Sequence, residues 1–421
     1  MRIPLLLAIL IAAAPAFAAN FIVTNTTHDL PDEAPGDGTC KVADGGTCTL
    51  RAAIMESNAL PGADVVILPA SAHITLSIAG RNEDAAATGD LDITGALTIS
   101  TFGAVAPDQR PIIDADGIDR VFDLRSGAGD VTIRYVRVIR GAATTADSFL
   151  GGGIQVGSVS FLHLDYSELS GNVANAGGAI HTNGVLSLFL SELHGNLVAD
   201  LGFTDARGSA IKDADSGPVQ PLDGVTLKLS TIYGNVALGA VPGAAIDLRR
   251  QVLVENSTIS GNQPRGLQVF AANANLNLVT ITGHQVGYAY TGVSLSESSV
   301  VRNSIIAGNS VADCILSGTV SYSHSYTLAS DASCNLGGFG VGNLASTQPR
   351  LKPLAIRYGI THVHDLLPGS PAIDHGNPTG GFPSRDQDDV PRPLDGDGVD
   401  GARCDMGSIE FVERIFADGF D

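Results

Sequence analysis

The hexapeptide SELSGN at residues 167–172 recurs along the chain and decides the fold. Close copies are SELHGN (191–196), STIYGN (230–235), STISGN (257–262) and SIIAGN (304–309), and VTITGH (279–284) is a degenerate one. The last residues of successive copies lie 24, 39, 27, 22 and 25 positions apart. Self-similarity at such intervals is typical of solenoid proteins, in which each repeat is one structural unit that stacks on its neighbours.

A second, glycine-rich motif follows the hexapeptides, as GGAI (177–180), GSAI (208–211) and GAAI (243–246). Between the two motifs lie short apolar alternations such as residues 185–190, and no strong helical period occurs in this region. Strands with tight glycine turns predict an all-β, right-handed parallel β-helix over residues 61–345. We expect interior columns of Ile, Leu and Val. The repeated asparagines are expected at one turn, either in left-handed conformation or as a stacked amide ladder.

The composition agrees with a solenoid and excludes several other classes of protein. The 421 residues include 50 glycines and no tryptophan, and aromatic residues make up 5%, which suits narrow aliphatic columns. Forty-four acidic against 24 basic side chains give a net charge of −20, which disfavours a nucleic-acid partner. The spacing of leucine-rich repeats and the blade length of propellers are both missing from this sequence.

The two ends of the repeat region have different compositions. Residues 49–60 predict a helix with Thr49 as its N-cap, ended by Pro61-Gly62. We expect this helix, within an N-terminal unit at 19–60, to close the first opening of the solenoid. Eight of the 20 prolines fall in the last 76 residues, which predicts a separate C-terminal cap or attachment segment at 346–421.

The first 18 residues have the organisation of a secretory signal peptide. Arg2 precedes an apolar run at 5–14, and Ala16-Phe17-Ala18 fits the cleavage site. No later stretch approaches the ~20 apolar residues of a membrane-spanning helix. We therefore expect an exported monomer that is secreted or held at the outer cell surface.

Five cysteines fit an oxidising destination. Cys40 and Cys48 flank a short Gly- and Asp-rich loop, and Cys314 and Cys334 bracket a Ser/Tyr-rich segment, so we predict these two disulfides. Cys404 is left over. A zinc site is the alternative, but the chain has no C-x-x-C motif and its histidines are scattered.

Sequence motifs at both ends resemble those of known families. CTLRAAI (48–54) followed by PGAD (61–64) resembles the N-terminal signature of CSLREA-domain proteins, with Thr49 and Ala52 in place of Ser and Glu. SPAID (370–374) and CDMGSIE (404–410) resemble the choice-of-anchor Q region, and residues 415–421 are similar to a short tail of some exported Gram-negative bacterial proteins. The resemblance implies a secreted or surface-attached β-helix of the pectin-lyase-like superfamily, without a defined reaction.

The repeat register predicts one surface cluster. If the side chains of Ile154, Ile180, Ile211, Ile246, Val269 and Leu295 point inward, the next residues point outward: Gln155, His181, Lys212, Asp247, Phe270 and Ser296. Because coils lie ~4.8 Å apart, His181, Lys212 and Asp247 are expected to meet, with Arg249 nearby. We also expect the insertions at 142–150 and 197–207 to wall this face as a groove.

Such a groove suits an acidic polysaccharide. In a lyase, Lys212 or His181 takes the proton next to a carboxylate that Arg249 neutralises. The alternative is a solvated face with incidental charges.

Asp395, Asp397 and Asp400 alternate with glycines in a second candidate site. Hard oxygen ligands in a flexible loop are what Ca²⁺ requires, although the closing Glu of an EF-hand is absent. The alternative is an acidic, solvated turn.

Two functions remain open from the sequence. The first is a non-catalytic, exported β-helix that acts by adhesion or carbohydrate contact, with an extracellular or cell-surface polysaccharide as its partner. The second is a polysaccharide lyase or glycoside hydrolase acting on acidic polysaccharide in the groove. The Gly-His-Gly motif of β-helix polygalacturonases is missing from the chain.

Overall fold

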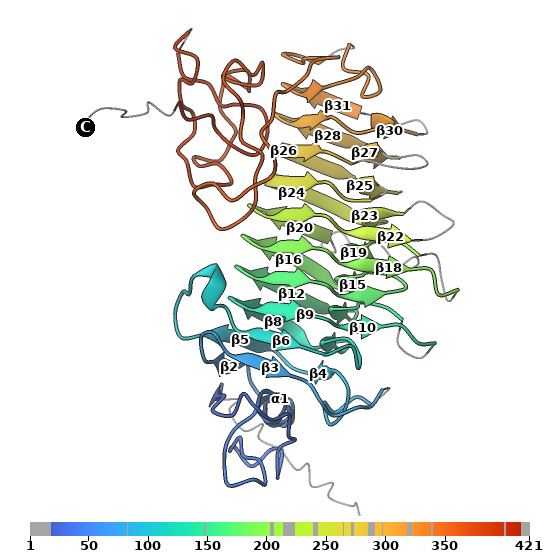
Figure 1. Cartoon of the computed structure of the whole chain (residues 1–421), viewed down its shortest axis with the longest axis vertical. Coiled ribbons are helices and arrows are strands. Elements are labelled where there is room, and N and C mark those ends of the chain that lie inside the picture. The colour runs from blue at the N-terminus through green and yellow to red at the C-terminus, as the bar shows by residue number, and fades with distance from the viewer. Residues whose placement is uncertain are drawn as a thin grey trace, which may run out of the picture.

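The computed structural model describes residues 18–81, 83–146, 149–202, 206–213, 224–238, 243–263, 265–270, 273–284, 291–296, 298–317, 322–337, 340–399 and 401–413. The predicted signal peptide, apart from Ala18, and the predicted terminal tail lie outside these residues. Within them the chain forms a parallel β-helix, as the repeats predicted, and successive coils stack along one axis (Figure 1). All the pairings between its named strands are parallel.

In the described residues the strands form three sheets along the solenoid. The nineteen-stranded sheet contains β1 (Asn20–Ile22), β2 (Asp64–Leu68), β3 (His73–Thr75), β5 (Leu97–Thr101), β6 (Ile112–Asp114), β8 (Gly129–Arg134), β9 (Arg137–Ile139), β12 (Ser160–Asp165), β13 (Glu168–Ser170), β16 (Val185–Phe189), β17 (Glu192–His194), β20 (Gly224–Lys228), β21 (Thr231–Tyr233), β24 (Gln251–Ser260), β26 (Ala274–Thr282), β28 (Ser299–Arg302), β29 (Ile305–Ala307), β31 (Tyr322–Ser325) and β32 (Leu328–Ala329).

The nine-stranded sheet contains β4 (Leu91–Ile93), β7 (Phe122–Leu124), β11 (Ile154–Val156), β15 (Ile180–Thr182), β19 (Ile211–Asp213), β23 (Ala244–Leu248), β25 (Arg265–Val269), β27 (Thr291–Leu295) and β30 (Ala312–Leu316). The four-stranded sheet contains β10 (Ala142–Ala143), β14 (Val173–Ala174), β18 (Leu197–Ala199) and β22 (Val236–Leu238). A short 3₁₀ helix, η1, spans Pro107–Gln109.

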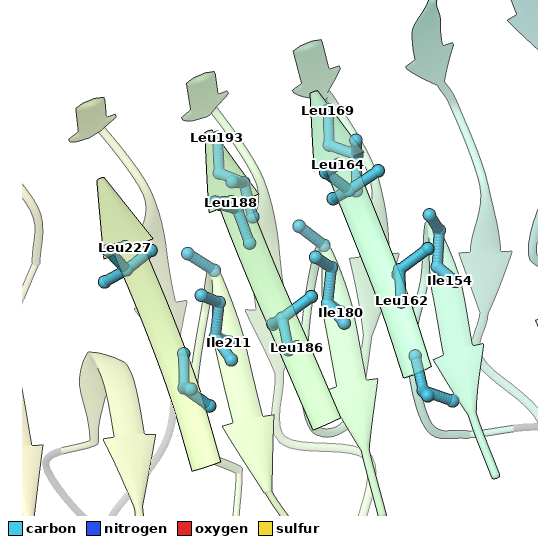
Figure 2. Packing of buried hydrophobic residues seen from close by; sticks show 14 of the residues in the cluster. Ile154, Leu162, Leu164, Leu169, Ile180, Leu186, Leu188, Leu193, Ile211 and Leu227 are labelled. Carbon is cyan, nitrogen blue, oxygen red and sulfur yellow. The ribbon is translucent and has the colours of Figure 1, made fainter. Parts of the chain in front are cut away.

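Aliphatic columns fill the interior, as expected from the alternating strands. Ile154, Ile180 and Ile211 are register partners on consecutive strands of the nine-stranded sheet, and Leu162 and Leu186 pair in the same way across the nineteen-stranded sheet. Figure 2 shows these side chains stacked between the two sheets. All of them are buried. Because each coil covers the apolar residues of the next, the core grows along the axis and needs little aromatic volume.

The repeated asparagines form the amide ladder that was one of the two predicted arrangements. Asn172, Asn196 and Asn235 each donate from Nδ2 to the Oδ1 of the next asparagine at 2.9 Å, and Asn262 ends this run. The left-handed residue of the turn is instead the preceding glycine, for example Gly171 with a φ of 66°. His284 continues the column, because its Nδ1 accepts the backbone N–H of Asn262 at 3.0 Å.

Single left-handed residues also make the corner between the two strand rows of the nineteen-stranded sheet. We call this set the corner column; its φ values run from 45° to 57°, and it comprises Tyr135, Tyr166, Leu190, Leu229, Asn256, Leu278, Asn303 and Tyr326. Non-glycine residues adopt this conformation rarely, and strain there persists only where the surroundings impose it. Here the register of the strands on both sides imposes it in coil after coil.

The predicted N-terminal helix is α1 (Leu50–Ala59), and it contacts β2 and β4 of the first coil (Figure 1). Thr49 is its N-cap and accepts the backbone N–H of Ala52 at 3.1 Å. The side chain of Arg51 is buried, pairs with the carboxylate of Asp29 at 2.7 Å and donates to the carbonyl oxygen of Ala86 at 2.8 Å. These bonds tie the helix to the loop beside β4. Among the described residues no helix has the length and apolar character needed to cross a membrane.

Both predicted disulfides, Cys40–Cys48 and Cys314–Cys334, are present, one near each end of the solenoid. Cys404 is a buried free thiol, and burial raises its pKa to about 12.

The C-terminal segment, whose described part spans residues 346–399 and 401–413, packs along the flank of the solenoid beside β24 and β26 (Figure 1). Thr258 donates to Oε1 of Gln387 at 2.7 Å, and the backbone N–H of Ser408 donates to Oγ1 of Thr280 at 3.0 Å. A small apolar cluster joins the same surfaces, with Ile305, Ala307 and Leu328 on the solenoid and Leu366, Ala372, Ile373, Met406 and Phe411 on the segment. The segment therefore covers the side of several coils.

Candidate functional site

The outer face of the nine-stranded sheet carries a continuous row of polar side chains. Successive register partners along the sheet define this outer row, which comprises Asp92, Asp123, Gln155, His181, Lys212, Asp247, Gln268 and Ser294. His181, Lys212 and Asp247 are consecutive members, which is the neighbourhood predicted from the repeat.

The prediction is wrong for the last two members of the row, which lie two residues before the predicted Phe270 and Ser296. Ile246 pairs with Leu267 and not with Val269, and Leu267 pairs with Val293, so Gln268 and Ser294 replace Phe270 and Ser296. Inward positions recur at every second residue of a strand, so Leu267 and Val269 both point inward. The alternation of apolar and polar residues along a strand predicts which face a side chain occupies. Which residues of the next coil it lies beside is decided only by how the coils pair.

Every member of the row except the half-buried Gln155 is buried, whereas the sequence predicted an exposed cluster. The exposed fractions are 6% for His181, 2% for Lys212 and 1% for Asp247. A charged side chain at this depth loses its hydration and is stable only with a charged or hydrogen-bonding partner close by.

Lys212 has such partners on its own strand and on the next coil. Its Nζ lies 3.6 Å from Oδ1 of Asp213 and 3.8 Å from Oδ1 of Asp247, and it donates to the carbonyl oxygen of Asp213 at 2.5 Å. Arg250 approaches the same Asp213 carboxylate from a later turn, with its Nε at 3.6 Å. Burial raises the pKa of Asp213, and the Lys212 ammonium opposes that rise. The four side chains form a buried ionic network.

Arg249 lies beside the row and outside it. Its backbone N–H donates to Oδ2 of Asp213 at 2.7 Å, and its Cζ lies 5.7 Å from the ring centroid of Phe270. Arg207 approaches the same ring at 5.7 Å and places its Nη1 4.0 Å from Oδ2 of Asp247. Phe270, which the sequence placed in the row, is thus held between two arginines next to it.

The insertions at 142–150 and 197–207 contain strands that the sequence did not indicate. β10 and β18 lie at their starts and pair through β14 between them, within the four-stranded sheet. Strands of two or three residues are too short to give a recognisable alternation.

At its N-terminal end the row leads into an acidic cluster that the sequence reasoning missed. Asp92 and Asp123 are register partners, and Asp90 lies two residues before Asp92. Oδ2 of Asp123 accepts from Nη1 of Arg120 and of Arg125, each at 2.9 Å. Asp90 and Asp92 are buried, and burial is the main reason that their pKa values rise to about 8 and about 7. Neighbouring carboxylates, Asp123 among them, raise both further.

A weak signal for this cluster exists in the sequence. LDI (91–93) and FDL (122–124) place an aspartate between two inward apolar residues, much as IHT (180–182) places a histidine between inward Ile180 and Thr182. Extending the predicted row by two coils towards the N-terminus finds both aspartates. Chemically, the cluster sets carboxyl groups with raised pKa values beside Asp123, which accepts hydrogen bonds from two arginines.

The predicted calcium loop is only partly described. The carboxylates of Asp395 and Asp397 lie together, and the fold adds Asp374, so that one oxygen atom from each falls within 4.8 Å of the others. Asp400 lies outside the described residues. Oδ2 of Asp374 accepts the backbone N–H groups of Gly396 at 2.8 Å and Asp397 at 2.9 Å. Asp374 thus organises the loop, and Asp395 and Asp397 supply its exposed carboxylates.

The chain matches no protein-family model, no curated protein and no solved structure among those compared with it. The function is therefore inferred from the geometry of the chain itself.

Proposed function

We propose that the protein is an exported, non-catalytic β-helix that binds carbohydrate at the cell surface or outside the cell. The expected signal peptide and the resemblance of both ends to CSLREA-domain and choice-of-anchor Q proteins support export. Two disulfides fit the same destination. Stacked coils provide long, regular faces, which suit an extended polymer.

The proposal that the protein is not an enzyme rests on one observation: Lys212 in the outer row is buried and surrounded by its own ionic partners. A general base needs a free lone pair within reach of the substrate proton. Nζ of Lys212 is buried, donates to the carbonyl oxygen of Asp213 and lies 3.6 and 3.8 Å from the carboxylates of Asp213 and Asp247, so it is already bonded inside the protein. This network holds the first predicted base, Lys212, away from a substrate, and the second, His181, is only 6% exposed.

Two measurements on the mature protein test this function. Polygalacturonate and alginate are incubated with the protein, and the absorbance of unsaturated uronate products is followed. Binding of the same polymers and of neutral polysaccharides is measured in parallel by affinity electrophoresis. We expect retardation by at least one polysaccharide and no unsaturated product. Lyase turnover that Lys212→Met abolishes would show that the protein is an enzyme.

A glycoside hydrolase is the second candidate, and the acidic cluster is the observation that favours it. Glycoside hydrolysis generally uses one protonated and one ionised carboxyl group. Asp92 favours its protonated form up to about pH 7, and Asp123 lies on the adjacent strand between Arg120 and Arg125. Release of reducing ends that disappears in both Asp92→Asn and Asp123→Asn would support it. If the native protein releases none, the binding function stands alone.

A further inference from the structure

A cleft of about 420 Å³ lies where the C-terminal segment meets the corner column. Its solenoid wall includes Tyr166, Phe189 and Lys228, and its other wall is formed by Pro383 and residues 385–387 and 389 of the segment. We call it the corner cleft. It belongs to a different face from the outer row, because these solenoid residues lie at the corner of the nineteen-stranded sheet. Its volume falls within the range of small-molecule sites, roughly 300–1,000 Å³.

The first feature of the cleft is a fixed aromatic wall. The ring of Tyr166 stacks on that of Tyr135 in the preceding coil at a centroid distance of 4.8 Å, and Phe189 meets it edge-on at 5.6 Å. Tyr166 and Phe189 line the cleft, whereas Tyr135 supports Tyr166 from outside it. Rigid, half-exposed aromatic rings offer an apolar contact surface at a small cost in conformational entropy.

The second feature is a balance of charge. Nζ of Lys228 lies 3.4 Å from Oε2 of Glu255, and Nη1 of Arg385 lies 3.1 Å from Oδ2 of Asp389. All four side chains line the cleft as two ion pairs, and the remaining charged lining residue, Asp386, accepts the backbone N–H groups of Val390 and Glu410. A polyanion gains little from cations that carboxylates already neutralise. Paired charges instead present both donors and acceptors, which suits a neutral ligand rich in hydroxyl groups.

The third feature is an incompletely bonded amide. Asn256 lines the cleft and is only 2% exposed; its Nδ2 donates to the carbonyl oxygen of Arg385 at 2.8 Å. Its Oδ1 has no hydrogen-bond partner among the residues that the structure describes. A buried acceptor without a partner costs free energy, and a ligand hydroxyl that reaches Oδ1 through a small shift of the Asn256 side chain removes that cost.

From these three features we propose that the corner cleft binds a neutral saccharide, either a single ring or the end of an oligosaccharide. The apolar C–H face of the sugar ring packs on Tyr166 and Phe189, and its hydroxyl groups bond to the ion pairs and to Asn256. The proposal rests on the proposed function for the class of ligand, carbohydrate. It goes further by naming a site and by selecting neutral over acidic sugars.

The chain itself supplies a matched pair of variants. Tyr166→Leu removes the aromatic wall, and leucine already occupies the corner column at Leu190, Leu229 and Leu278 with the same backbone conformation. Tyr135→Leu removes the same stacking contact from the ring that lies outside the cleft. Any loss of stability that both variants share is therefore caused by the lost stacking of Tyr135 on Tyr166 and not by a change in the cleft.

The experiment is isothermal titration of the full mature protein and of both variants with cellohexaose, xylohexaose, mannohexaose and an oligogalacturonate. For the neutral oligosaccharide that binds, we expect Tyr166→Leu to raise Kd about tenfold and Tyr135→Leu to change it less than about twofold. Equal Kd values in the two variants would overturn the assignment to the cleft.

The acidic oligosaccharide separates the two proposals. If the oligogalacturonate alone binds, or binds the cleft more tightly than the neutral sugars, the neutral-saccharide inference is wrong and the carbohydrate function stands. If none of the four sugars binds the native protein, and no polysaccharide retards it in electrophoresis, both proposals fail.

Discussion

The asparagine ladder and the outer row are built on the same geometry but use it in opposite ways. Each places one polar side chain per coil at a fixed register, and all of these side chains except that of Gln155 are buried. In the ladder the same amide recurs, and each member satisfies the next at 2.9 Å. In the outer row almost every coil carries a different side chain, and charges are balanced between specific neighbours.

The difference teaches how to interpret a solenoid sequence. An amide carries one donor group and one acceptor, so identical amides can continue along the axis without limit. A buried charged side chain needs an opposite charge close by or a shifted pKa, so repeating it along a column is costly. Where the outer row does repeat aspartate, at Asp92 and Asp123, burial raises the pKa of the first and two arginines bond the second. Repetition therefore marks positions that build the fold. Variation at a buried register position marks a local network that needs its own explanation.

The largest expected effect comes from the middle of the ladder. Asn235→Ala removes the acceptor of the Asn196 amide and the donor to the Leu193 carbonyl oxygen, both in the interior. We expect the free energy of unfolding to fall by about 3–4 kcal/mol. Asn235→His is the matched control, because His284 already continues the same column, and it should lose less. Chemical denaturation of the three proteins measures the difference; equal losses would show that the ladder bonds are not the cause.

The next effect probes the outer row. Lys212→Met leaves the carboxylates of Asp213 and Asp247 short of one buried cation, and we expect a loss of about 2–3 kcal/mol, because arginines remain near both. The double variant Lys212→Met, Asp247→Leu removes one charge of each sign and should lose less than the sum of the two single variants. Strict additivity in a double-mutant cycle would disprove the ionic network.

The two columns should also respond to pH in opposite directions. In the ladder, burial lowers the pKa of His284 to about 4, below its ordinary value of 6.5. The unfolded chain binds more protons between these values, so this contribution to stability is complete above about pH 6.5 and is lost as the pH falls towards 4. His284→Asn should flatten the acid side of a plot of melting temperature against pH.

At the N-terminal end of the outer row the sign is reversed. Burial raises the pKa of Asp92 from 3.8 to about 7, so the folded state binds more protons between these values. This stabilising contribution is complete below about pH 4 and is lost as the pH rises through about 7. Asp92→Asn keeps the shape and an acceptor for the Ala86 N–H, and should flatten the alkaline side only. If Asp92→Asn also flattened the acid side of the plot, the raised pKa of Asp92 would not be the cause.

The smallest effect is expected at the carboxylate loop, which lies outside both columns. Binding of Ca²⁺ by Asp374, Asp395 and Asp397 should raise the melting temperature by a few degrees, since bound ligand stabilises the folded state by mass action. Chelator should reverse the rise, and Asp397→Asn should remove it. Identical melting curves with Ca²⁺ and with chelator would leave the loop as a solvated turn.

Much of the fold follows from local chemistry and was predictable. The hexapeptide repeat indicated the solenoid and its aliphatic columns, and it offered the amide ladder as one of two arrangements of the asparagines, because stacking places chemically equivalent residues side by side. Thr49 and Pro61-Gly62 bounded the helix correctly, since capping and helix termination depend on nearby residues. The side chains of His181, Lys212 and Asp247 were placed together for the same reason: alternation and coil spacing are properties of each strand.

Only the tertiary structure decided register, burial and the contacts between distant segments. The choice between Leu267 and Val269 depended on how two coils pair, and the burial of Lys212 on what surrounds its strand. The corner cleft joins Tyr166 to Arg385, and the carboxylate loop joins Asp374 to Asp397. A repeat encodes the interactions of each coil with its neighbours. The path of the non-repeating C-terminal segment across those coils depends on side-chain contacts with no period, and so it appears only once the chain has folded.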